Sequence, residues 1–272
     1  MKKTSKIMSL VLAGAMVLSL GACSGGGTAE TTKAELTEAV TAASSEEGTE
    51  AASEAGEGAG QTAEGTTYKI GILQLVQHTA LDAANEGFIA ALDEAGIQYD
   101  LDSQNASGDQ SACQTVASKF ANDKKDLILA IATPAAQAVA GAVTDTPVLI
   151  TAVTDPAESG LVDDNQKPGG NVTGTSDLTP VKEQIDLLKQ ILPDAKKVGI
   201  LYCSAESNSE IQAQMAREAI EAAGMTSQDF TVSSSNEIQT VVQSMVGKVD
   251  AIYAPTDNTI AAGMTTVGMV AG

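Results

Sequence analysis

The stretch YKIGILQLV at residues 68–76 decides the fold, because its central Gly-Ile-Leu returns within KVGILYC at residues 197–203. Both stretches are short apolar runs of the length of a buried strand. In each copy, a glycine that ends a helical pattern follows 25 residues after the first glycine, at Gly96 and at Gly224. The equal spacing predicts two similar units within one chain.

Outward from the first copy, short apolar strands alternate with amphipathic helices. This alternation predicts an α/β fold with parallel sheets that helices cover on both faces. After the second copy, we expect a helix that begins near Asp257 and runs to the end of the sequence. The first unit is expected to contain strands over 68–76, 97–101, 127–131 and 148–153, and helices over 81–94, 110–121 and 134–143.

The two units predict two lobes with a crevice between them. Residues 68–177 form the expected N-terminal lobe, and residues 178–272 form a C-terminal lobe that lacks its last strand, so we expect the natural protein to continue. A single doubly wound domain with an accidental match is the alternative. Ligands of open α/β sheets bind beyond the carboxyl ends of the strands, which both lobes would turn to the crevice.

The N-terminus has the pattern of an export signal. Basic residues precede an apolar run of 14 residues, Ile7–Leu20, which is too short to span a bilayer. A cysteine, Cys23, follows small residues and is expected to carry lipid, so that residues 1–22 are a lipoprotein signal peptide. An ordinary secretory signal is the alternative. Residues 23–67, with nine glutamates and no aromatic residue, are expected to be a disordered acidic tether on the outer face of the bacterial membrane.

Composition excludes several classes of protein. The net charge of −20 argues against nucleic acid and anionic membrane surfaces as partners. With one histidine and no CxxC or HExxH motif, we expect no metal site and no cofactor. Cys113 and Cys203 fall in different lobes, so two separate, partly buried thiols are favoured over a disulfide.

Polar residues cluster where the expected strands end. Thr133 is expected to be a helix N-cap with Pro134 at the first helical position, and Ser207 to Glu210 fits a capping box. Each polar residue has the alternative role of a plain cap or turn former. The candidate ligand-binding residues are His78, Leu81, Asp82, Thr133, Pro134, Thr154, Asp155, Ser176, Asp177, Tyr202, Glu206, Ser207, Asn208, Thr256, Asp257 and Asn258.

This set of residues suits a zwitterion. The free N–H groups at a helix start such as Thr133 can hold a carboxylate, and Asp155, Glu206 or Asp257 can hold an ammonium group. Tryptophan is absent, and Phe88, Phe120 and Phe230 are expected in the core, which leaves few rings for a sugar pocket. Tyr202 and Tyr253 end strands of the second lobe, where they either face the crevice or pack under loops.

Seven ordered segments resemble those of the ABC-transporter substrate-binding family that includes tryptophan- and tyrosine-binding lipoproteins. The resemblance covers residues 68–272; it departs at Thr79, where a proline is expected. It implies a type I periplasmic-binding-protein fold with two Rossmann-like lobes and an amino-acid-like, often aromatic, ligand. The segments are GILQ (71–74), HTALD (78–82), TPAA (133–136), VTDP (153–156), NVTGTSD (171–177), ESNS (206–209) and PTDN (255–258).

The resemblance implies a monomeric binding protein that closes on its ligand and docks on an ABC permease. A nucleoside or sugar is the alternative ligand. A sensor that presents its closed form to a receptor kinase is a rival from another class. A hydrolase is disfavoured, because no GxSxG motif occurs and a single histidine, His78, leaves little room for a Ser/His pair.

Overall fold

Two parallel β-sheets organise residues 65–272, the part of the chain that the computed structural model describes. The first sheet has the strand order β2-β1-β3-β4-β5, and the second has the order β7-β6-β8. All recorded strand pairs are parallel, which confirms the predicted α/β class. The predicted signal peptide, the lipidation site Cys23 and nearly all of the tether lie outside the described residues.

The elements follow the expected alternation. The first sheet and its helices comprise β1 (Tyr68–Gln74), α1 (Thr79–Glu94), β2 (Tyr99–Asn105), α2 (Gln110–Asp123), β3 (Leu127–Ile131), α3 (Thr133–Ala142), β4 (Val148–Val153) and β5 (Val172–Ser176). The second group comprises α4 (Val181–Ile191), β6 (Lys197–Cys203), α5 (Ser207–Ala222), β7 (Thr226–Val232), the 3₁₀ turn η1 (Ser235–Glu237), α6 (Ile238–Met245), β8 (Ala251–Tyr253), α7 (Asn258–Ala262) and α8 (Met264–Ala271). We keep the names N-terminal and C-terminal lobe for these two groups; their boundary at 177/178 stays a prediction.

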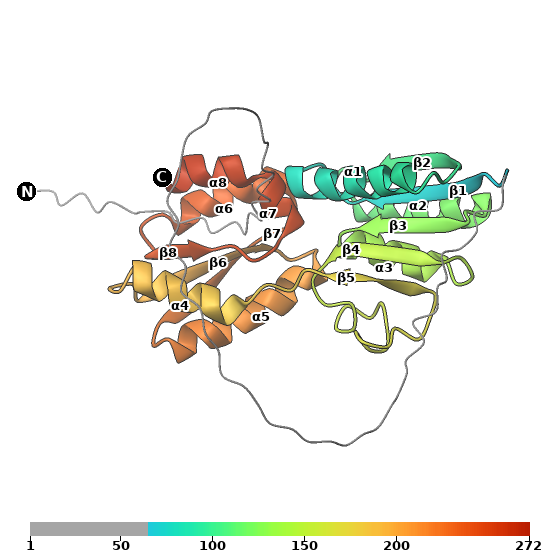
Figure 1. Cartoon of the computed structure of the whole chain (residues 1–272). Helices are drawn as coiled ribbons and strands as arrows, with labels where there is room; N and C mark the ends of the chain where they lie inside the picture. Colours follow the sequence, from blue (N-terminus) through green and yellow to red (C-terminus); the bar gives the residue numbers. More distant parts are fainter. Residues whose placement is uncertain (1–64) are drawn as a thin grey trace, which may run out of the picture. The chain divides into compact units, whose positions relative to one another are not determined.

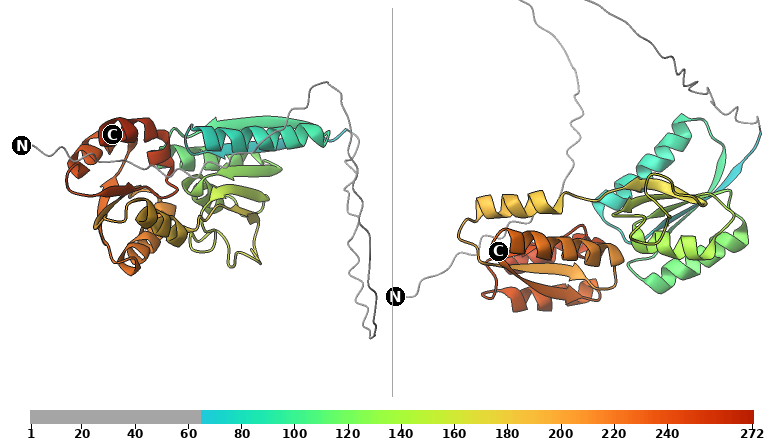
Figure 2. Two further views of the ribbon diagram at one scale, coloured as in Figure 1. Left: turned by 60° about the vertical axis from the view of Figure 1, so that its left-hand side comes forward. Right: turned by 90° about the horizontal axis from the view of Figure 1, so that it is seen from below.

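Helices cover both faces of each sheet. In the N-terminal lobe, α1 lies on one face, and α2 and α3 lie side by side on the other (Figure 2). In the C-terminal lobe, α4 and α5 cover one face of the sheet, and α6 and α8 cover the other (Figure 1). This arrangement follows from right-handed crossovers, because the chain reverses its direction across the sheet after β2 and after β7.

The repeated glycine has the same packing role in both lobes. A Cβ atom on Gly71 would stand 2.9 Å from the ring of Phe120, which α2 packs against β1. A Cβ atom on Gly199 would stand 2.5 Å from the Cε atom of Met245, which α6 packs against β6. Each glycine therefore lets a large side chain from a covering helix approach the central strand of its sheet.

In both lobes, an aspartate before a strand ties neighbouring strands together at their starts. Asp126 precedes β3, and its carboxylate accepts a hydrogen bond from the backbone N–H of Lys69 at 2.7 Å. Asp250 precedes β8 and accepts from the backbone N–H groups of Lys196 and Lys197 at 2.8 and 2.9 Å. These two aspartates are thus structural, and they lie at the opposite end of each sheet from the candidate site.

Two predicted boundaries were wrong. We expected a strand over 97–101, but β2 runs over Tyr99–Asn105, because the N–H of Ile97 still bonds the Leu92 carbonyl in the turn that ends α1. We expected one helix from Asp257 to the end, but the chain breaks at Gly263 into α7 and α8. A side chain at Gly263 would overlap Ile238 of α6, so the break allows a close approach of two helices.

Cys113 and Cys203 are free, which confirms the prediction of two separate thiols; both are buried more completely than expected. Within residues 65–272, the helices include none with the length and apolarity that crossing a bilayer requires.

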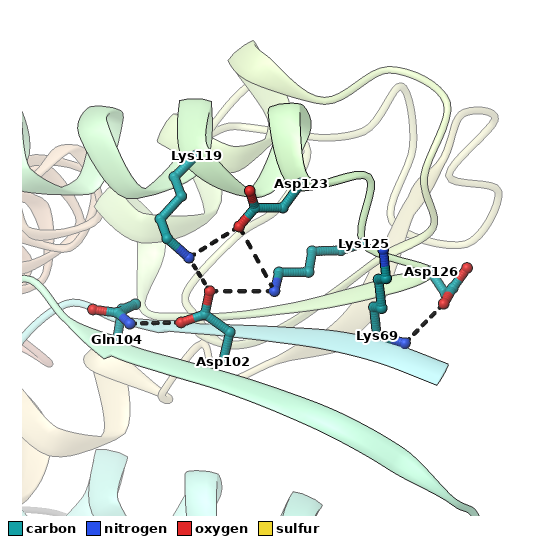
Figure 3. Close-up of polar contacts among 7 residues, drawn as sticks. All are labelled: Lys69, Asp102, Gln104, Lys119, Asp123, Lys125 and Asp126. Atoms are coloured by element: carbon teal, nitrogen blue, oxygen red, sulfur yellow. Dashed lines mark hydrogen bonds and ion pairs between the residues drawn. The ribbon is translucent and has the colours of Figure 1, made fainter. Parts of the chain in front are cut away.

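A charged cluster joins β2 to α2 and to the residues just after it (Figure 3). Asp102 pairs with Lys119 and, at 3.2 Å, with Lys125, whose side chain is only 8% exposed. Both ammonium groups stand over the Phe120 ring, at 5.7 and 5.5 Å from its centre. Burial opposes ionisation of Asp102, but hydrogen bonds from Lys119, Gln104 and Lys125 outweigh it and lower its pKa to about 2.

We expect Asp102→Asn to lower the free energy of unfolding by about 2 kcal/mol, because it leaves the buried ammonium of Lys125 without its nearer partner. The wild-type contribution should be present above about pH 4 and be lost as the pH falls towards 2, since the folded pKa is depressed. Urea titrations at pH 7 and pH 3 measure both effects. Asp186→Asn, which breaks a surface pair, is the control; equal losses in the two variants at pH 7 would contradict the prediction.

Candidate functional site

A cavity of about 100 Å³ opens at the carboxyl ends of strands from both lobes. Segments that follow β1, β2 and β3 line one side, and segments that follow β6, β7 and β8 line the other. This is the position at which open α/β sheets bind ligands. The lining residues are Leu75, Val76, Ser107, Gly108, Gln110, Pro134, Cys203, Ala205, Glu206, Ser233, Ser234, Ser235, Thr259 and Ala262.

The start of α3 lies beside the N-terminal wall, to which it contributes Pro134. Thr133 is fully buried, and its hydroxyl has no hydrogen-bond partner. Ala132, with φ 85° and ψ 151°, occupies a backbone region that only glycine adopts easily. The prediction that Thr133 is the N-cap was wrong by one residue: Ala132 is the N-cap, and Thr133 is the first helical residue, before Pro134. The strained backbone of Ala132 and the unpartnered hydroxyl of Thr133 thus lie next to the free N–H groups at the start of α3, beside the cavity.

Glu206 forms the acidic part of the C-terminal wall, and it is 3% exposed. Its carboxylate accepts hydrogen bonds from the backbone N–H groups of Asn258 (3.2 Å) and Thr259 (2.9 Å). It also accepts from the Asn258 amide at 2.6 Å and the Thr259 hydroxyl at 2.8 Å. The first role of Glu206 is therefore to hold the start of α7, and its lone pairs are already occupied.

Asp257 places a second buried carboxylate beside Glu206. One oxygen accepts from the backbone N–H of Cys203 at 2.6 Å, and the other accepts from the N–H of Ile260 at 2.7 Å as the N-cap of α7. Burial, with the nearby charge of Glu206, raises the pKa of Asp257 to about 7. Two carboxylates in one buried place concentrate negative charge behind the cavity wall.

We expect stability to fall as the pH rises from about 4 to about 7, because folded Asp257 holds a proton that the unfolded chain releases near pH 4. Above about pH 7 this contribution should be flat. Urea midpoints measured at intervals between pH 4.5 and 8 test the slope against Asp257→Asn, which removes the titrating group. Parallel pH profiles for the two proteins would show that Asp257 does not titrate in this range.

The residues predicted at the start of α1 do not line the cavity. Leu81 is 2% exposed and belongs to the N-terminal core. Asp82 accepts a hydrogen bond from the Gln74 amide at 2.7 Å. His78 is the N-cap residue of α1 but makes no side-chain cap bond, and its Nε2 atom is buried without a partner.

The residues predicted at the ends of β4 and β5 form a cluster of their own. The Ser176 hydroxyl donates to the Thr154 carbonyl at 2.6 Å. Asp155 organises the following turn, where its carboxylate accepts from two backbone N–H groups at 3.2 Å and from the Asn165 amide at 2.9 Å. Burial raises the pKa of Asp177. These four residues hold the chain where it leaves the first sheet, and none of them is among the residues that line the cavity.

Tyr202 and Tyr253 lie in the core of the C-terminal lobe instead of the cavity. Side chains alternate along β6, so Tyr202 shares the face of Ile200 towards α5. Its hydroxyl donates to Asp229 at 3.2 Å, and that of Tyr253 donates to Gln184 at 2.7 Å. Of the two alternatives, the structure favours packing within the lobe, since neither ring is among the residues that line the cavity. Cys203, on the opposite face of β6, reaches the cavity.

The start of α5 differs from the predicted capping box. Glu206, not Ser207, is the N-cap residue, and Glu210 pairs with Arg217. Ser207 is exposed and accepts from the Gln137 amide of α3 at 3.2 Å. Two further predicted residues serve the neighbouring α7: the Asn208 amide donates to the Thr256 carbonyl at 3.2 Å, and Asn258 donates to Glu206 as described above.

Most of the cavity-lining polar residues were missed from the sequence. Ser107, Gly108 and Gln110 follow β2, whose end was placed too early, and residues 233–235 follow β7, which was not assigned. The signal that would have found them is the same for both segments, small polar residues directly after a strand. Among the described residues, no group of three or more His, Cys, Asp or Glu side chains is placed to hold a metal ion.

The arrangement is suited to binding a small polar molecule. Hydroxyls and one carboxylate lie on the C-terminal wall, and a helix start with an unpartnered hydroxyl lies beside the N-terminal wall. Apolar side chains of Leu75, Val76 and Pro134 complete the lining. Polar groups placed among apolar side chains in a concave lining are typical of small-molecule sites.

The model of the ABC transporter substrate binding protein family matches residues 69–272. A tyrosine-binding protein of Clostridioides difficile (strain R20291) is 45% identical over 206 residues, which are 74% of this chain and 60% of that protein. The chain thus spans about 60% of the length of this curated relative.

Three solved structures extend the comparison. An ABC domain from Streptococcus pneumoniae in complex with L-Trp has 44% identity and a TM-score of 0.72, over 75% of this chain and 70% of that one. A ligand-free, open substrate-binding protein from Clostridium difficile has 46% identity and a TM-score of 0.53, over 75% and 71%. A leucine-binding protein from Thermotoga maritima, 16% identical with a TM-score of 0.52 over 70% and 56%, shares the fold alone, that of type I periplasmic binding proteins.

Proposed function

The chain belongs to the ABC transporter substrate-binding protein family, and on this premise we propose that it captures an aromatic amino acid outside the cytoplasm and delivers it to an ABC permease. In this proposal Cys23 carries the lipid anchor, residues 23–67 are the tether, and the protein acts as a monomer. The observation that carries the proposal is the cavity to which both lobes contribute the carboxyl ends of their strands. The two similar relatives described with L-Trp and as tyrosine-binding support the ligand class.

The walls of the cavity support an amino-acid-like ligand. The free N–H groups at the start of α3 and the unpartnered Thr133 hydroxyl suit an α-carboxylate. The buried negative charge of Glu206, beside which Asp257 keeps its proton up to about pH 7, favours an ammonium group on the opposite side. Since the lone pairs of Glu206 are occupied, the serine hydroxyls at 233–235 are the better direct acceptors.

Lobe closure is the proposed mechanism of capture. The two relatives from the preceding comparison have similar identities to this chain, 44% and 46%, but the TM-score is 0.72 with the L-Trp complex and 0.53 with the open, ligand-free protein. A score for a whole chain falls when two lobes are turned relative to each other, so this difference supports a closed arrangement here. A ligand that touches both walls shifts the population towards such a state.

Titration with L-tryptophan tests the proposed ligand class directly. The chain contains no tryptophan, so indole emission excited at the red edge comes from the ligand alone. A saturable blue shift that L-tyrosine competes away is expected, because the indole moves from water to an apolar lining. A flat signal from protein that circular dichroism shows to be folded would reject the aromatic amino acid. A thermal-shift panel of nucleosides and sugars would then identify the replacement, since a bound ligand stabilises the folded state.

A further inference from the structure

Gln212 on α5 is fully buried, and its amide makes five hydrogen bonds. The nitrogen donates to the Thr154 hydroxyl (3.2 Å), the Asn208 carbonyl (3.4 Å) and the Thr256 carbonyl (3.2 Å). The oxygen accepts from the Thr256 N–H and the Thr179 hydroxyl, both at 3.3 Å. Since a glutamine amide has two N–H donors and two lone pairs, every hydrogen-bonding position is used.

The partners of Gln212 come from three separate segments. Thr154 follows β4 of the N-terminal lobe, Thr179 lies in the crossover between β5 and α4, and Thr256 lies between β8 and α7. Hinge motions of two-lobed proteins are absorbed by a few residues in such crossovers. Gln212 therefore joins the crossover, where we infer the hinge, to one segment of each lobe.

Hydrogen bonds within the N-terminal lobe hold the residues that lead into the crossover. The N–H of Asp177 bonds the Val153 carbonyl at 3.0 Å, and the Ser176 hydroxyl bonds the Thr154 carbonyl. These bonds join the end of β5 to the end of β4 and involve no residue of the C-terminal lobe. The Gln212 amide adds a bond from the other lobe to the same place, so rotation about the crossover must break or stretch it.

We propose that Gln212 is a positioning residue that stabilises the closed arrangement of the two lobes. It is absent from the residues that line the cavity, so it acts on ligand affinity through closure and not through contact. Its importance for capture rests on the proposed function, while its effect on the lobes does not. A protein that closes more readily binds more tightly, because the competent state is more populated.

Two variants test the role. Gln212→Met keeps the length of the side chain and removes all five hydrogen bonds, and Thr179→Val removes only the bond from the crossover. Gln214→Met, on the exposed side of the same helix, is the matched control. Spin labels on Glu86→Cys and Glu221→Cys, exposed positions of α1 and α5, report the distance between lobes. The background carries Cys23→Ser and Cys203→Ser, because Cys203 reaches the cavity, whereas Cys113 is buried in the core.

We expect both variants, without ligand, to gain a population of long distances, and L-tryptophan to bind about tenfold more weakly to Gln212→Met. Saturating L-tryptophan should restore the short distance, and Gln214→Met should match the wild type. Wild-type distances and affinity in both variants would overturn the proposal. If Gln212→Met fails to fold, the distances and the affinity measured for Thr179→Val test the proposal. If the wild type binds no L-tryptophan, the proposed function fails, and the distance distributions without ligand still test Gln212.

Discussion

Replacement of Gly174 by alanine is expected to lower the free energy of unfolding by about 3 kcal/mol or more, because β5 has no room for a methyl group at this position. A Cβ atom there would overlap the carbonyl oxygen of Ile150 and stand 2.7 Å from its nitrogen. These are backbone atoms of β4, with which Gly174 is in register. They cannot give way without separation of the two strands.

The local geometry explains why the strands approach so closely. The pairing of β4 with β5 shifts its register between Ile150 and Val153, and Ala152 inside this irregularity has φ 54°. Such an irregularity bends its strand and increases the local twist. Because β5 leads directly into the crossover, separation of these strands would also displace Ser176 and Asp177.

Circular dichroism during urea unfolding is the measurement, since the chain has no tryptophan to report on its own fold. Gly170→Ala is the matched control: it lies in the loop just before β5, and nothing stands within 4 Å of its added Cβ atom. We expect the control to stay within about 0.5 kcal/mol of the wild type. Equal midpoints for the two variants would mean that β5 contributes nothing to stability.

The sequence predicted the buried strands well and the edge strands badly. The bounds of β3 and β4 agree with the prediction, because both are apolar runs that turn-forming residues limit. Edge strands β2 and β7 carry polar side chains on both faces, so hydrophobic periodicity does not reveal them. Asp102, in β2, pairs with Lys119 of α2 and with Lys125 just after that helix, contacts that only the tertiary structure creates.

Cap positions failed for a different physical reason. A threonine before a proline is a good N-cap, yet at α3 the preceding Ala132 takes that place in a backbone conformation that its residue type disfavours. At α5, the N-cap residue is Glu206 and not Ser207, and the Glu206 carboxylate accepts hydrogen bonds from the start of α7. Local sequence propensity does not predict either of these N-cap positions, because both depend on contacts with residues distant in sequence.

The location of the candidate site could be predicted from the sequence, but the residues that line it could not. Parallel strands put their carboxyl ends at one edge, so the location followed from the repeat alone. Pro134 and Glu206 were predicted and line the cavity, whereas Leu81 and Tyr202 were predicted and lie in the core. The side chain that faces the cavity at a strand end depends on which face of the sheet a helix covers. Only the tertiary structure determines this.

Glu206→Ala is expected to cost about 3 kcal/mol, since it leaves the N–H groups of Asn258 and Thr259 buried without an acceptor. Glu206→Gln keeps one acceptor oxygen, so its loss should be clearly smaller. Glu210→Ala, one turn later on α5, removes an exposed carboxylate that interacts with Arg217 and Tyr202 and is the control, with an expected change of about 0.5 kcal/mol. Urea unfolding at pH 7 ranks the three variants.

The glutamine variant also separates the two roles of Glu206. Removal of its charge should lower the pKa of Asp257 and narrow the pH range over which stability falls, because one of the causes that raise that pKa disappears. If negative charge behind the wall attracts the ammonium group of the ligand, Glu206→Gln should also weaken L-tryptophan binding by about tenfold or more while the fold is largely retained. Unchanged affinity with a narrowed pH range would mean that Glu206 serves α7 alone, and that the ammonium group is held by neutral acceptors such as the serines at 233–235.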